Sequence, residues 1–148
     1  MSKILRATAI CALILVAVAV LLSGCTTTTA TPTLQITTPS NGATVRTGDI
    51  SVRADVTNFR VVDKQGQANV TGEGHLHFYM DVTPIPNAAG QPAIPANSSA
   101  AWAHVSDTSY TFRGVPPGTH TFVAQLVNND HSPVVPTVSD MVTVTVTT

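Results

Sequence analysis

The sequence predicts an all-β protein: an immunoglobulin-like antiparallel β-sandwich of about seven strands that occupies residues 34–148. Three observations carry this prediction. Apolar residues alternate with polar ones at a period of two, turn residues recur about every ten positions, and no segment after residue 24 shows a helical period of 3.6. A segment of about 115 residues is close to the usual size of one domain, so a single core suffices.

The alternation defines the expected strands one by one. Ile50, Val52 and Ala54 alternate with polar residues in one segment, and Phe122 and Ala124 do the same in another. Together, the expected strands are residues 34–36, 50–56, 59–61, 75–81, 110–112, 119–127 and 142–146.

One long connection interrupts this rhythm. Residues 84–99 contain Pro84, Pro86, Pro92 and Pro95, which is too many prolines for a central strand. We expect this segment to cross the outside of the domain as an ordered, partly polyproline loop. Two possible N-glycosylation sites, at Asn69 (Asn-Val-Thr) and Asn97 (Asn-Ser-Ser), stand in stretches expected to be exposed.

The amino-terminal segment has the pattern of an export signal. Lys3 and Arg6 precede an uncharged apolar run of about 16 residues, shorter than the roughly 20 that span a bilayer as a helix. The run ends in Leu-Ser-Gly-Cys25, which resembles the lipobox of lipoproteins. We predict a lipoprotein signal peptide at residues 1–24 and lipidation of Cys25; the alternative is an uncleaved membrane anchor. Both place the domain outside the cytoplasm.

The tether, the net charge and the cysteines limit what the rest of the chain can bind. Residues 25–33 form the lipidated cysteine and a threonine-rich tether. Removing Lys3 and Arg6 with the signal leaves five basic residues against eight acidic ones, a net charge of −3. This charge gives no basic surface for nucleic acid, so the expected partner is the membrane, through the lipid; no protein partner is predicted. With Cys25 blocked, no free thiol remains to bind a metal.

Histidines are the candidate functional residues. His75 and His77 are separated by one residue in an expected strand, so both side chains lie on one face, about 6.6–6.8 Å apart along the strand. If segments 75–81 and 119–127 pair antiparallel, His131 follows the strand end beside His75. His104 returns beside the same strand through the proline-rich loop as a fourth candidate.

Each histidine also has a simpler interpretation. A His-x-His pair occurs by chance in exposed strands, and His131 could cap the Asn-Asn-Asp turn before it. His120 follows a Pro-Gly turn at the opposite end of its strand, so we expect it to be a structural residue far from the others.

Imidazole ligands without thiolates suit copper or zinc, and the Irving–Williams order favours copper(II). Asp130, beside His131, is a candidate to orient that ligand from outside the coordination sphere. Met80 shares the parity of the core residues and is expected in the core. No catalytic residues are predicted, because Asp130, His131 and Ser132 are sequence neighbours that cannot form a spatial triad.

These motifs resemble a family. Gly74-His75-Leu-His77, the isolated His104, Pro-Gly-Thr-His120-Thr and Asn-Asp-His131 are similar to the pattern of a family of extracytoplasmic modules designated a domain of unknown function. The resemblance spans roughly residues 35–148. In this chain Leu76 stands where the family tends to have a middle histidine, and the usual glycine-rich stretch after His104 is missing. The family implies an extracytoplasmic immunoglobulin-like module and brings no established activity.

The sequence therefore predicts a membrane-tethered, non-enzymatic module that binds copper or zinc through its histidines. The alternative is a structural or adhesive module of the cell envelope without a metal, in which the histidines only join strand ends.

Overall fold

A computed structural model describes residues 30–97 and 101–148. Residues 31–148 form one compact unit, and the described part of the chain contains strands and no helix. No helix long and apolar enough to cross a membrane occurs in that part. The strands are β1 (Thr33–Thr38), β2 (Thr44–Arg46), β3 (Gly48–Thr57), β4 (Arg60–Val61), β5 (Glu73–Met80), β6 (Ala101–Val105), β7 (Ser109–Val115), β8 (Gly118–Val127) and β9 (Ser139–Thr147).

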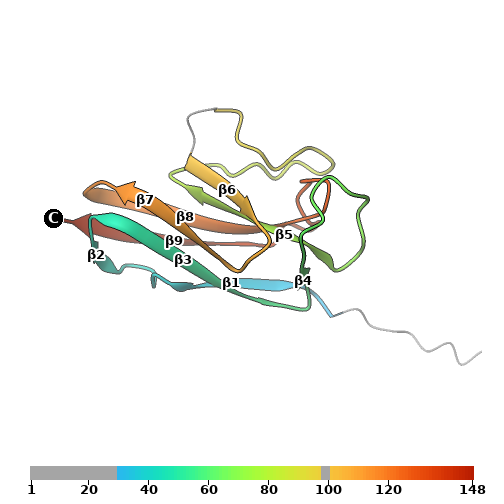
Figure 1. The fold of residues 1–148 in the computed structure, drawn as a ribbon, viewed down its shortest axis with the longest axis horizontal. Helices are drawn as coiled ribbons and strands as arrows, with labels where there is room; N and C mark the ends of the chain where they lie inside the picture. Colours follow the sequence, from blue (N-terminus) through green and yellow to red (C-terminus); the bar gives the residue numbers. More distant parts are fainter. Residues whose placement is uncertain (1–29, 98–100) are drawn as a thin grey trace, which may run out of the picture. The chain divides into compact units, whose positions relative to one another are not determined.

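The strands form two sheets, which confirms the predicted all-β sandwich (Figure 1). One sheet has the order β1-β3-β7, and the other has the order β2-β9-β8-β5-β4, with β6 also paired to β5. Alternate residues of both sheets meet in a common core, as the period of two predicts. The buried core comprises Ile36, Ile50, Val52, Ala54, Leu76, Phe78, Phe112, Val115, Phe122, Ala124, Leu126, Val142, Val144 and Val146.

The structure has two strands that are absent from the predicted set, β2 and β6, and both are short; the predicted strand at residues 59–61 is present as β4. β2 pairs with β9 in parallel, and β6 pairs with β5 antiparallel. β2 has only three residues, and β6 (Ala-Trp-Ala-His-Val) is apolar at four of its five positions, so neither segment shows an alternation of period two.

The outward face of the six-stranded sheet is covered near β5, so this strand is buried on both faces. The cover is the proline-rich segment between β5 and β6 (Figure 1). Hydrogen bonds fasten it: Gln125 Nε2 donates to the Pro86 carbonyl (3.0 Å), and Ala93 N donates to the His131 carbonyl (2.7 Å). A second, polar interior therefore lies between sheet and loop.

Candidate metal centre

Strand β5 places two histidines on the outward face of its sheet. Leu76 and Phe78 enter the core between the sheets, so His75 and His77, with the opposite parity, point the other way. Both rings are nevertheless 0% exposed, because the proline-rich segment covers them.

Strand pairing brings the other two histidines to the same place. His104 on β6 stands opposite His77 in the antiparallel register, which puts both side chains on one face. On the other side of β5, Val127 of β8 stands opposite His75, and the turn that follows β8 carries His131. The ligand nitrogens of the four histidines lie within 4.8 Å of one another.

This spacing is close to what a metal ion requires. His75 Nε2 lies 3.2 Å from His77 Nε2, and His104 Nδ1 lies 3.0 Å from His131 Nε2. With metal–nitrogen bonds of 2.0–2.1 Å, tetrahedral ligands are about 3.3–3.4 Å apart, and square-planar neighbours are about 2.9 Å apart. The four histidines could therefore hold one ion after a contraction of the widest pair by about an ångström.

His77 is already in the tautomer that a ligand needs. Its Nδ1 donates to the carbonyl oxygen of Ala93 (2.8 Å), which can only accept, so its Nε2 carries the lone pair, which faces His75 Nε2 (3.2 Å). The Tyr79 hydroxyl lies 3.1 Å from the same Nδ1 and 2.7 Å from Gln125 Oε1. A ligand histidine fixed by a backbone carbonyl is the usual arrangement around protein metals.

His75 is less well satisfied. Its Nδ1 is buried and has no hydrogen-bond partner. An unpaired buried polar atom costs about 1–3 kcal/mol, which an apolar residue at this position would avoid. The structure of the domain thus tolerates a cost to keep an imidazole here.

Burial keeps the inner imidazoles uncharged. Desolvation lowers the pKa of His75 from 6.5 to about 4 and that of His77 to about 3, with the neighbouring imidazoles acting in the same direction. Desolvation and His104 also lower the pKa of His131, while Asp130 opposes that shift. Neutral imidazoles at neutral pH are the form that binds metal.

A network of polar groups holds the turn that carries His131. His131 has a positive φ of 67°, and its N–H donates to the Asn128 carbonyl. The carboxylate of Asp130 accepts from Ser132 N and Oγ (2.9 and 2.6 Å) and from Asn69 Nδ2 (2.7 Å). Asp130 therefore bonds to the turn itself and to Asn69; its influence on the His131 ring is electrostatic.

Glu73, which is not among the predicted site residues, also holds this turn. Glu73 is 2% exposed and pairs with Arg60 and Lys64, and it accepts from Asn129 Nδ2 (3.3 Å) in the turn. The hydrogen bond from Lys64 is the main reason that its pKa falls to about 2. Its position as the only glutamate of the chain, next to the histidine motif, was the available signal.

Three further residues at the site were also not identified: Tyr79, Ala93 and Gln125, all 0% exposed. Tyr79 continues the parity of the His-x-His pair, so the pattern His-x-His-x-Tyr marks one polar face of the strand. No sequence signal singles out Ala93, because its role depends only on its backbone groups.

The remaining candidates lie elsewhere. His120 Nδ1 contacts Asp81 Oδ2 (2.6 Å) and its Nε2 contacts the Pro116 carbonyl (3.0 Å), away from the cluster, as a structural residue would. Met80 packs against the core. Asn69 and Asn97 are both exposed. The predicted signal peptide and Cys25 lie outside the described residues.

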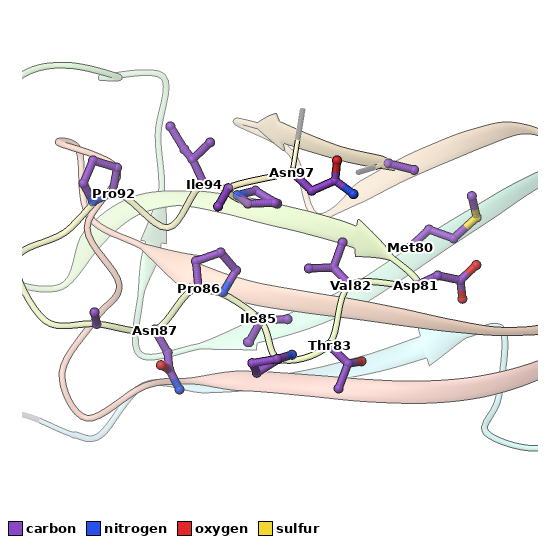
Figure 2. A pocket seen from close by; sticks show the side chains of 15 residues that line it. Met80, Asp81, Val82, Thr83, Ile85, Pro86, Asn87, Pro92, Ile94 and Asn97 are labelled. Carbon is purple, nitrogen blue, oxygen red and sulfur yellow. The ribbon is translucent and has the colours of Figure 1, made fainter. Parts of the chain in front are cut away.

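The domain also has a cavity whose lining contains none of the four histidines. A cavity of about 750 Å³ lies between the end of β5 and the proline-rich segment, where Val82, Ile85, Pro86 and Ile94 line it (Figure 2). Asp81 is the one ionisable residue in its lining, so this cavity offers little chemistry.

Comparisons with known proteins give a family and no activity. The model of a family designated a domain of unknown function, DUF4399, matches residues 52–147. No curated protein matches. Among solved structures, a crystal structure of an engineered protein from the Northeast Structural Genomics Consortium is similar, with 17% identity and a TM-score of 0.45. The match covers 81% of this chain and 21% of that one, so the chain spans about a fifth of its length.

Proposed function

Because the chain belongs to the DUF4399 family, whose function is unknown, we propose a function from the histidine cluster itself: a membrane-tethered, extracytoplasmic module that binds copper or zinc. The observation that carries the proposal is the convergence of His75, His77, His104 and His131 within 4.8 Å. These residues would supply four nitrogen ligands from two strands and a turn.

The chemistry of the donors supports a borderline metal. Nitrogen-only ligands suit copper(II) and zinc, whereas magnesium and calcium prefer oxygen. The unpaired His75 Nδ1 and the fixed tautomer of His77 favour a binding role over mere packing. The tether rests on the predicted lipidation of Cys25, which would hold the domain near the outer surface of the membrane.

The second candidate is a structural or adhesive module without a metal. One observation favours it: the imidazoles already pair with each other, His75 with His77 and His104 with His131. In that case the second pair serves only to join β6 to the turn after β8.

Titration of the metal-free protein with copper(II) or zinc decides between them. Trp102 is the only tryptophan and its ring lies 5.2 Å from that of His77, so bound copper(II) should quench its emission at one equivalent. His77→Gln should remove this response, and calorimetry should show the same loss for zinc. His120→Ala is the matched control and should bind as the wild type does. If the wild type and His77→Gln bind the metal equally well, the metal site is refuted and the structural role of the histidines replaces it.

A further inference from the structure

The four histidines are held very unequally. His75 and His77 are fully buried on the central strand β5, whereas His104 is exposed and His131 is half-buried. An ion bound among them would therefore have a protected side and a side that faces solvent.

The supports of the rings differ in the same way. His77 is fixed by the Ala93 carbonyl beneath the loop, and its strand is paired on both sides. His104 lies on β6, which pairs along one edge only among the described strands. The hydrogen bond of the His104 ring goes to another candidate ligand, His131 Nε2 (3.0 Å), and the edge of the Trp102 ring contacts it from outside the cluster (centroids 5.8 Å apart).

Four histidines could close this site as four ligands close a structural site, but the four are not equally protected. Structural zinc sites enclose the ion with four protein ligands, while sites that exchange ligands keep a position open to solvent. Here the ligand nearest to solvent, His104, lies on a strand that is paired along one edge only among the described strands, so its position is the one at which an incoming ligand can replace an imidazole.

Building on the proposed function, we propose that this domain transfers its metal ion to an acceptor: His75 and His77 retain the ion while His104, then His131, give way to the acceptor's ligands. The acceptor is a molecule that presents nitrogen or sulfur ligands. No oxidation is involved; each step breaks one metal–imidazole bond and forms one metal–acceptor bond, so the ion does not pass through water.

The rate at which the ion leaves tests the proposal. The full chain is loaded with one equivalent of copper(II), and Trp102 emission is followed after mixing with excess free histidine as the acceptor. Direct transfer makes the rate of fluorescence recovery rise with the histidine concentration. His104→Ala should speed recovery by about tenfold or more while still binding copper, since a change within one site acts mainly on the dissociation rate. His120→Ala should leave the rate unchanged.

Two results would count against this scheme, and they differ. A recovery rate that does not depend on the histidine concentration, or that is the same in wild type and His104→Ala, would overturn transfer while leaving metal binding intact. Absence of any quenching by copper(II), together with no heat on zinc addition, would overturn the proposed function itself.

Discussion

Gly74 stands in β5 directly before the first histidine, and its replacement by alanine tests how tightly this strand is held. A methyl group at this position would lie 2.0 Å from the Val127 carbonyl oxygen and 3.0 Å from the Phe59 ring. Ordinary contacts begin at 3.4 Å, so the methyl and the β8 backbone would have to separate by more than 1 Å.

The cost of this separation is large for a single methyl group. Overpacking a closed interior costs about 1–3 kcal/mol, and each backbone hydrogen bond lost between β5 and β8 adds about 0.5–1.5 kcal/mol. We therefore expect Gly74→Ala to lower the free energy of unfolding by about 3–5 kcal/mol, much of the 5–15 kcal/mol typical of a domain. Displacement of His75 should also weaken metal binding.

Gly72→Ala provides the matched control two residues away. Gly72 has a φ of 80° but no atom within 4 Å of the added methyl, so only backbone strain of about 1–2 kcal/mol is expected. Equilibrium denaturation of both variants in guanidinium chloride measures the difference. If Gly74→Ala is no more destabilising than Gly72→Ala, the close packing of β5 on Val127 has been misjudged.

Three further predictions concern titration, the distant histidine and the anchor. His75 and His77 have folded-state pKa values of about 4 and 3 against 6.5 unfolded, so below pH 6.5 the unfolded chain binds protons that the folded one does not. The metal-free protein should therefore have its full stability above pH 6.5, and its free energy of unfolding should fall by at most about 1.4 kcal/mol per pH unit for each histidine as the pH is lowered. Denaturation at pH 7.5 and at pH 5 measures the difference, and equal stability at both pH values would refute the prediction. His120→Ala should cost about 1 kcal/mol of stability through the lost contact with Asp81, seen in the same denaturation experiment, without changing metal affinity. Cys25→Ala should abolish partition of the protein into detergent; mass spectrometry of the native protein showing an intact, unlipidated residue 1 would contradict lipidation.

Local pattern was enough to predict the all-β sandwich. The alternation of residues 50–56 and 119–127 reflects one face in the core and one outside, and such a pattern survives in any antiparallel arrangement. The same parity argument put His75 and His77 on one face, because side-chain direction in a strand depends on neighbours alone. Parity did not predict β2 and β6, because β2 has only three residues and β6 is apolar at four of its five positions.

The sequence by itself determined the strand pattern, the absence of free thiols after Cys25 and the pairing of His75 with His77. Only the tertiary structure decided that His104 faces His77 across β5–β6, that both inner rings are buried, and that Ala93 fixes the tautomer. The physical reason is that register and loop coverage arise from contacts between residues far apart in the chain. A histidine's role as a ligand depends on those contacts, whereas its place on a strand face does not.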